Sequence, residues 1–514
     1  MKRIDDCLSE RNGHLFIEQM DAVSLISEFG SPLFVFSEDQ LRRNVRRFQT
    51  AFSAGWPGPV KVMPAVKANW TLAVQRVLAS EGCGADIYSP GELEVALRAG
   101  MQPQHISVNG VPKDPEHIAK TLAVGARLTI DSLRDVQILE QLAPHCKRPA
   151  RVAIRLRPAV STFHCSSDFV PEGPVPTDIA ALAYKGGLSF AEAVQAGKRV
   201  LTLPNVELVG FHQHHGRHHA STQWWESQMT AFAKEIAALC AELGGYRPKE
   251  LDIGGGFAIP RDPHNAATDR AAPFQLGALF GISWLLRILG SAMRYRLLRP
   301  LLSLASQHPN TQPAPTIEAY GEATTRALQA ALRAENIDPS TITLQLEPGR
   351  SIHGNAGVHL TTVCATKTMK EPVPWNHVVI DTSEFWMAGG RFEHHLHDYR
   401  VANKMNAPMA MTADVIGRSC YGDRLLGGVA LPAMEVGDVF CLLDTGAYQE
   451  VSASNFNAMA RPAAILVSGD SAHVIRRAET LDDVFARDEV PPHLQQNQQP
   501  RTTRQPGRVD RPAS

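Results

Sequence analysis

The sequence predicts an α/β protein, a (β/α)8 barrel followed by a C-terminal β domain. Between about residues 41 and 356, short apolar runs alternate regularly with helical segments, which is typical of parallel βα units. From residue 357 to 480 the strand-like runs follow one another with no long helix between most of them. The chain of 514 residues has room for both parts, since one such barrel takes about 250 residues.

Each predicted barrel strand is followed by space for a helix. Helices are expected over residues 71–81 and 90–99, where helical segments follow the first two strands. About eight such units close a barrel. The strands are expected at residues 60–66, 84–88, 106–108, 126–131, 151–155, 206–210, 250–253 and 343–346.

The remaining segments are assigned by the same patterns. Residues 1–40, with a strand at 33–36, are expected to pack with the β domain. Residues 481–514 end in a stretch rich in Pro, Gln and Arg and are expected to form a disordered tail. The strands of the β domain are expected at residues 358–365, 378–381, 410–416, 439–443 and 463–467.

Two barrel segments, residues 161–187 and 260–316, are predicted to be insertions. Each is far longer than the roughly two to six residues of an ordinary βα loop, and loops after barrel strands surround the active-site mouth. Residues 271–286 of the second insertion are uncharged and mainly apolar. We expect a packing helix or a lid there. A helix lying on a lipid surface and a membrane span are the alternatives, and the run is shorter than the roughly 20 residues of a span.

Composition and charge narrow the class of protein. The chain has 51 Lys and Arg against 52 Asp and Glu, which argues against a nucleic-acid coat protein or a polybasic membrane binder. Its 8 cysteines form no C-x-x-C pair, so neither a disulfide framework nor a zinc site is expected. The first residues lack the apolar core of a signal peptide, and a cytoplasmic enzyme is expected.

Lys67 ends an apolar run in the setting Ala-Val-Lys-Ala-Asn. A lysine at the C-terminal end of a barrel strand points into a mouth of low dielectric constant. Desolvation there is expected to lower its pKa and to favour the neutral amine that forms a Schiff base. The alternative is an ordinary solvated lysine at the surface.

Two short turns follow strands late in the barrel. Gly254, Gly255 and Gly256 lack Cβ atoms, so their backbone amides can close around a phosphate, although a simple tight turn needs the same residues. The run from Glu347 to Arg350 places a carboxylate and a guanidinium in one turn. These groups suit a protonatable nitrogen and a phosphate, or an ordinary salt bridge at the surface.

Five histidines lie between residues 212 and 219. Zinc ligands on a helix would need pairs at i and i+4 in a motif such as H-E-x-x-H, which the segment lacks. We therefore predict a histidine stacked on a flat ligand and no metal site.

The motifs also occur together in a known order. They are Lys67, His214, the glycines 254–256, the run 347–350, Cys420 with Asp423, and the run 444–448. In this order the chain resembles the fold-type III pyridoxal-phosphate decarboxylases, in particular the diaminopimelate decarboxylase branch, which is related to ornithine and arginine decarboxylases. The resemblance covers about residues 32 to 467. It implies an alanine-racemase-like barrel, a C-terminal β-barrel or β-sandwich domain, and pyridoxal 5'-phosphate as the cofactor.

The resemblance also implies roles for single residues in decarboxylating an amino acid. Lys67 would carry the cofactor as a Schiff base, and His214 would stack on its ring. Glu347 would hydrogen-bond the pyridine nitrogen and keep it protonated, which makes the cofactor an electron sink. Cys420 would reach across a head-to-tail homodimer and handle the proton at the α-carbon. The other cofactor-binding residues would be Asp86, Gly254, Gly255, Gly256, Gly349, Arg350 and Tyr448.

The sequence departs from the family around the substrate. The diaminopimelate enzymes usually have Cys-Glu-Ser-x-Asp at the partner loop, whereas residues 420–423 are Cys-Tyr-Gly-Asp, without the glutamate that binds the distal amino group. Of the usual Arg-Pro-x-x-Tyr motif Arg391 alone could remain, and Arg217 replaces a phosphate-binding serine. Tyr421, Asp423 and Arg391 are the candidate substrate-binding residues. We expect a modified or conjugated amino acid rather than unmodified meso-diaminopimelate.

Other functions stay open on the same fold. An amino-acid racemase would have an arginine at the pyridine nitrogen and a catalytic tyrosine on the partner, which Glu347 and Cys420 argue against. A pseudoenzyme that binds the cofactor would be expected to lose Lys67 or the phosphate ligands. A membrane-associated scaffold would rest on residues 271–286 alone. We expect an amino-acid substrate and a homodimer, and no nucleic acid or membrane as a partner.

Overall fold

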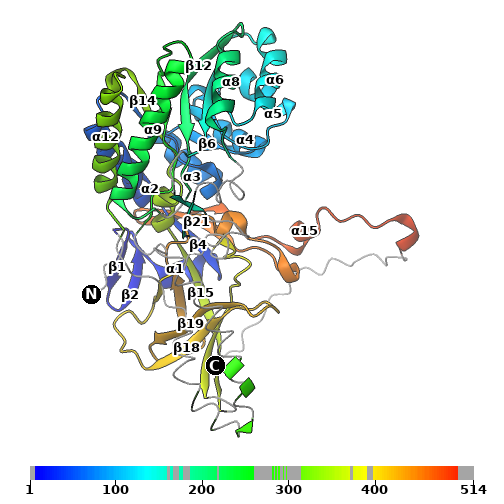
Figure 1. Ribbon diagram of the computed structural model, residues 1–514. Helices are drawn as coiled ribbons and strands as arrows, with labels where there is room; N and C mark the ends of the chain where they lie inside the picture. Colours follow the sequence, from blue (N-terminus) through cyan, green and yellow to red (C-terminus); the bar gives the residue numbers. More distant parts are fainter. Residues whose placement is uncertain are drawn as a thin grey trace.

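A computed structural model describes most of the chain. The described residues are 6–158, 162–165, 173–176, 186–216, 219–259, 281–282, 284–285, 288–289, 293, 297, 314–370, 374–389 and 397–495. Figure 1 shows two parts one above the other, a barrel with helices around it and a second part made mainly of strands.

The barrel confirms the fold predicted from the alternating pattern. Its eight strands are parallel and lie in the order β5-β14-β13-β12-β9-β8-β7-β6. A bridge between Ala65 and Asp86 joins the two ends of this sheet. The strands are β5 (Val60–Val62), β6 (Ala85–Ile87), β7 (Ile106–Val108), β8 (Arg127–Ile130), β9 (Ala150–Leu156), β12 (Val206–Gln213), β13 (Glu250–Asp252) and β14 (Thr343–Leu346).

The barrel helices begin at side-chain caps that the sequence supplies. Ser37, Ser89 and Ser132 each accept a hydrogen bond from a backbone amide of the first turn, which satisfies a donor that the helix itself cannot pair. The helices are α2 (Glu38–Gly55), α3 (Leu72–Ser80), α4 (Pro90–Arg98), α5 (Pro115–Val124), α6 (Leu133–Leu142), α8 (Phe190–Val200), α9 (Thr222–Glu242) and α12 (Ile317–Ala334).

The β domain incorporates the N-terminal segment. Its main sheet has the order β19-β18-β16-β15-β4-β21-β22, and β20 pairs with β15 and β17. Strand β4 (Leu33–Ser37) lies between β15 (Gly357–Met369) and β21 (Ala463–Ser468). The other strands are β16 (Trp375–Ile380), β17 (Tyr399–Val401), β18 (Met411–Ile416), β19 (Arg424–Leu431), β20 (Val439–Leu442) and β22 (Ser471–Arg476).

The first described residues pack on the same domain. The strands β1 (Leu8–Arg11), β2 (His14–Ile17) and β3 (Met20–Asp21) form a small antiparallel sheet, followed by α1 (Ala22–Phe29). Leu15, Leu25 and Val358 belong to one buried apolar cluster, which joins this segment to β15. The association results from apolar burial, which is the main favourable contribution to folding.

The segments outside the regular pattern are partly described. Within residues 161–187, β10 (Thr162–Cys165) and β11 (Gly173–Pro176) form an antiparallel pair. Most of the apolar run 271–286 lies outside the described residues. In the part of the chain that is described, no helix is long and apolar enough to cross a membrane. Residues 481–495, expected to belong to a disordered tail, contain α15 (Leu481–Val484) and η9 (Pro492–Leu494), because Thr480 caps α15.

Candidate active site

Lys67 lies in the short helix η1 (Val66–Ala68), just after β5 at the mouth of the barrel. Its Nζ donates to Oδ2 of Asp86 at 2.8 Å. Burial disfavours the ammonium, but Asp86, Tyr448 and Glu347 together outweigh burial and raise the pKa of Lys67. The expectation of a lowered pKa is therefore wrong, because the sequence did not reveal how close the Asp86 carboxylate lies. The same ion pair lowers the pKa of Asp86 in spite of its burial.

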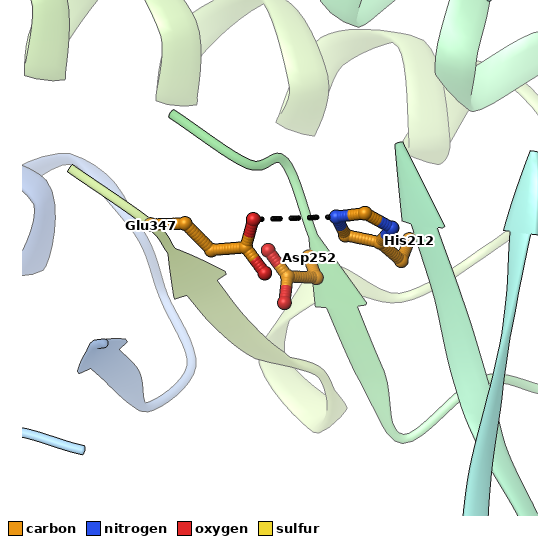
Figure 2. Close-up of side chains that lie close together, drawn as sticks. All are labelled: His212, Asp252 and Glu347. Atoms are coloured by element: carbon orange, nitrogen blue, oxygen red, sulfur yellow. Dashed lines mark hydrogen bonds and ion pairs between the residues drawn. The ribbon is translucent and has the colours of Figure 1, made fainter. Parts of the chain in front are cut away.

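Three side chains from neighbouring strands converge next to this pair (Figure 2). They are His212 of β12, Asp252 of β13 and Glu347, which follows β14, and their polar atoms all lie within 4.8 Å of one another. His212 Nε2 lies 3.3 Å from Glu347 Oε2. Asn109, which follows β7, donates to Asp86 at 2.8 Å and to Glu347 at 2.5 Å. Asn109 thus links the lysine pair to the cluster.

The charges of this cluster are not balanced at Glu347. Arg127 donates to Asp252 at 2.6 Å, and Lys67 pairs with Asp86. Among the described residues, Glu347 has no lysine or arginine within salt-bridge distance, and its ionisable neighbour is His212. Burial lowers the pKa of His212 to about 3, so the imidazole is neutral. Burial and the nearby Asp86 raise the pKa of Glu347, which indicates a carboxylate that needs a cation or its own proton.

The glycine turn closes against the ends of β12 and β14. Gly254 and Gly256 have φ values of +69° and +102°, which favour glycine. A Cβ atom at Gly255 would lie against the carbonyl oxygen of Glu347. The ring of His214 is fixed at the same end of β12, because its Nδ1 accepts a hydrogen bond from the Gly216 amide at 3.0 Å. Burial lowers the pKa of His214 well below its ordinary value, which leaves a neutral flat ring.

A loop of the β domain joins the site from the other side. The Tyr448 amide donates to the carbonyl oxygen of Ala68, next to Lys67, at 2.7 Å. The Arg350 guanidinium carbon lies 5.1 Å from the centre of the Tyr448 ring. A Cβ atom at Gly349 would lie 2.8 Å from the Tyr448 hydroxyl. Lys67, Arg350 and Tyr448, which are distant in sequence, are therefore brought together.

Cys420 lies in a separate loop of the β domain, with its side chain exposed. The next residue, Tyr421, is 51% exposed, and its ring meets the edge of Phe385 at 5.8 Å. Phe385 in turn stacks on Phe456 at 4.0 Å. An exposed thiol therefore lies next to a small aromatic surface.

Asp423 has a different environment from the one expected. Its side chain is buried, and its Oδ1 and Oδ2 accept hydrogen bonds from the Glu384 amide at 2.6 Å and the Ser419 amide at 2.7 Å. Because the loop's own amides occupy both oxygens, this carboxylate orders the loop. A substrate contact, as expected from the sequence, does not suit that position.

Other residues of interest were missed or lie outside the description. Arg391 and Arg217 are outside the described residues. The sequence assigned no role to Asn109, although its position directly after β7 is the kind of signal that identified Lys67. Arg127 gave no such signal, because its contact with Asp252 crosses the interior of the barrel.

Comparisons with known proteins agree with this geometry. Residues 38–272 match the family model of the pyridoxal-dependent decarboxylase, pyridoxal binding domain. Diaminopimelate decarboxylase of Zymomonas mobilis is 26% identical over 486 residues, covering 94% of this chain and 98% of that protein. The enzyme of Methanocaldococcus jannaschii is 29% identical over 504 residues, covering 95% and 98%. The chain belongs to the fold-type III pyridoxal-phosphate-dependent decarboxylases.

A solved structure supports the same assignment for this decarboxylase. The diaminopimelate decarboxylase of M. jannaschii in complex with L-lysine has a TM-score of 0.78 and 26% identity, covering 96% of this chain and 99% of that one. The expected enzyme class and cofactor are confirmed: the chain is an amino-acid decarboxylase that uses pyridoxal phosphate.

The described residues of the decarboxylase fit this cofactor. Pyridoxal phosphate offers an aldehyde, a ring nitrogen that can carry a proton, and a phosphate. The site offers the Lys67 amine, the Glu347 carboxylate without a cationic neighbour, and a glycine turn that side chains would fill. These three features lie on adjoining elements of one barrel mouth.

Proposed function

We propose that this decarboxylase acts on a modified or conjugated α-amino acid, with the cofactor held on Lys67, and that it functions as a homodimer. The observation that carries the cofactor assignment is Glu347, buried and without a lysine or arginine partner among the described residues. A buried carboxylate needs compensation, and a protonated pyridine nitrogen supplies it. We interpret the cluster with His212 and Asp252 in this way, since Arg127 already neutralises Asp252.

The other proposed roles follow from position. Lys67 would bind the cofactor, with Asp86 fixing its Nζ. His214 would stack on the ring, since its neutral imidazole is held rigid by the Gly216 amide. The phosphate would be bound by the remaining group, which is Gly254, Gly255, Gly256, Gly349, Arg350 and Tyr448.

The chain's own residues prepare the reaction. When bound, pyridoxal phosphate supplies an electron sink for the electron pair left on the α-carbon as CO2 departs. Glu347 holds the proton at the ring nitrogen, and Asn109 keeps that carboxylate in place. His212 stays neutral, so it does not compete for the charge of Glu347. Cys420, supplied by the partner subunit, would handle the proton at the α-carbon.

The substrate proposal rests on the loop that follows Cys420. Tyr421 stands where the diaminopimelate enzymes have the glutamate that binds a distal ammonium. Loss of a carboxylate opposite a charged group weakens binding by about 2 to 5 kcal/mol when the pair is desolvated. The aromatic surface of Tyr421, Phe385 and Phe456 suits an uncharged or bulkier distal group. Arg391 remains a candidate for the substrate carboxylate.

The first test is spectroscopic. Full-length protein is mixed with pyridoxal phosphate, reduced with borohydride and digested for peptide mapping. We expect a cofactor absorption band that borohydride abolishes, with the added mass on Lys67. Lys67→Ala should lack both, whereas Lys249→Ala, an exposed lysine paired with Glu207, should keep both. No band in the wild-type protein would make a pseudoenzyme the better description.

A CO2-release screen over amino acids then tests the substrate. The set includes meso-diaminopimelate, lysine, ornithine, arginine and derivatives acylated at the distal amine. We expect release from a derivative and weak release from diaminopimelate. Efficient turnover of diaminopimelate would contradict the substrate proposal and leave the cofactor assignment intact.

A further inference from the structure

The chain after β22 leaves the body of the molecule. Figure 1 shows the ribbon around α15 extending away from both domains. We call residues 480–495 the C-terminal arm. In the described structure, the hydrogen bonds of the arm connect its residues to one another or to Arg477, which pairs with Asp483. The arm is therefore held by local contacts and not by packing on its own subunit.

The arm exposes apolar side chains that a free segment would be expected to bury. Leu481, Phe485, Val490 and Leu494 are 60%, 50%, 51% and 61% exposed. Helices as short as α15, with four residues, are not stable in water without packing. Contiguous apolar surface of this kind marks an interaction site more often than a solvated one.

The position of the arm's root indicates what covers it. Glu479, just before the arm, accepts hydrogen bonds from Asn455 at 2.6 Å and from the Arg461 amide at 2.9 Å. Between these two residues lies Asn457, whose side chain bonds to Cys420. The arm thus begins at the loop cluster that carries the thiol proposed to enter the partner's site.

We infer that the C-terminal arm packs on a second copy of this chain, with Leu481, Phe485, Val490 and Leu494 buried between the subunits. The inference rests on the proposed homodimer and extends it, since it assigns to the arm an area of contact beyond the Cys420 loop. Apolar side chains at such contacts commonly supply much of the binding energy.

Sedimentation velocity of the full-length holoenzyme over a range of concentrations tests the arm. We expect a wild-type dimer, and for the double variant Leu481→Asp with Phe485→Asp a dimer dissociation constant raised at least about tenfold. Val436→Asp is the matched control, because Val436 is 69% exposed and lies outside the arm. An unchanged dissociation constant for the folded double variant would overturn the inference, as would a wild-type monomer.

A second measurement does not depend on how the double variant folds. A photo-crosslinking amino acid replaces Phe485 in a tagged chain, which is mixed with an untagged one. Crosslinks to the untagged chain are expected, and crosslinks confined to single chains would contradict the inference. Failure of the arm leaves the cofactor band and CO2 release unaffected. Failure of the proposed function is seen as loss of that band and that release in the wild-type protein.

Discussion

The side-chain amide of Asn457 holds Cys420 at two atoms. The Cys420 amide donates to Asn457 Oδ1 at 3.0 Å, and Asn457 Nδ2 donates to the Cys420 sulfur at 3.2 Å. Asn457 has a φ of +58°, a left-handed conformation that asparagine adopts more readily than most residues. The contact therefore fixes both the loop and the sulfur, and a donor to sulfur favours the thiolate.

Asn457→Asp is expected to slow the chemistry of Cys420. Aspartate keeps the acceptor for the Cys420 amide, but it removes the donor to sulfur and adds a negative charge. Alkylation of Cys420 by iodoacetamide at neutral pH should slow by roughly threefold to tenfold. The kcat should fall with little change in KM, because the substrate is bound by other residues.

Peptide mass spectrometry measures that rate against an internal standard. Cys364 is also an exposed free cysteine, and its alkylation should be the same in both proteins. Asn457→Gly removes the donor without the added charge and without backbone strain, so its effect should be smaller. Equal rates for Cys420 in the wild type and in Asn457→Asp would contradict the role of the amide.

The buried charge at Glu347 predicts a pH dependence of the cofactor-free protein. Its pKa is raised to about 7 in the folded state, mainly by burial, from an ordinary value of 4.5. The folded state therefore binds more protons than the unfolded state between about pH 4.5 and 7, and stability from this group is lost as pH rises through that range. Glu347→Gln has no such group, so its stability relative to wild type should increase from pH 5 to pH 8, by on the order of 2 kcal/mol.

Urea unfolding of both cofactor-free proteins at the two pH values measures this difference. Comparing the two proteins cancels the buried histidines, such as His353 and His359, whose lowered pKa values act in the opposite direction. Glu318→Gln is the control, because this carboxyl pairs with Arg47 and its pKa is lowered to about 2. A constant difference between Glu347→Gln and wild type would show that Glu347 is ionised at both pH values.

Much of this architecture follows from patterns in the sequence. The alternation of apolar runs and helices predicted the barrel, because each strand must be buried on both faces. Lys67, Glu347 and the glycine turn were found because each follows a strand, and parallel strands bring their carboxyl ends to one mouth.

What the sequence could not predict depends on contacts between distant segments. The Asp86 carboxylate reverses the expected shift of the Lys67 pKa, and no local pattern gives the distance between these residues. Likewise, the motif around Cys420 suggested a substrate contact for Asp423. Two backbone amides, from Glu384 and Ser419, instead occupy its carboxylate. Helix α15 depends on Thr480 and Asp483, whose capping contact is hidden in a polar tail.

Gly255→Ala should weaken cofactor binding. Its Cβ atom would lie against the Glu347 carbonyl oxygen, which is backbone and cannot move aside easily. The glycine turn and the 347–350 turn would have to separate, so we expect an affinity for pyridoxal phosphate at least about tenfold weaker. Gly91→Ala is the matched control, because its Cβ would have Ser89 Oγ as its nearest neighbour at 3.7 Å. Titration by absorbance measures both, and equal affinities would argue against the cradle.

Tyr421→Glu tests whether the Cys420 loop selects the substrate. Tyr421 is 51% exposed, so the change should not disturb folding. A glutamate there would restore a carboxylate opposite a distal ammonium, and kcat/KM for meso-diaminopimelate should rise by about tenfold or more. Tyr421→Gln has the same shape without the charge and should give little or none of that gain. Steady-state CO2 release decides between them, since equal gains for both variants would mean that size, not charge, excludes diaminopimelate.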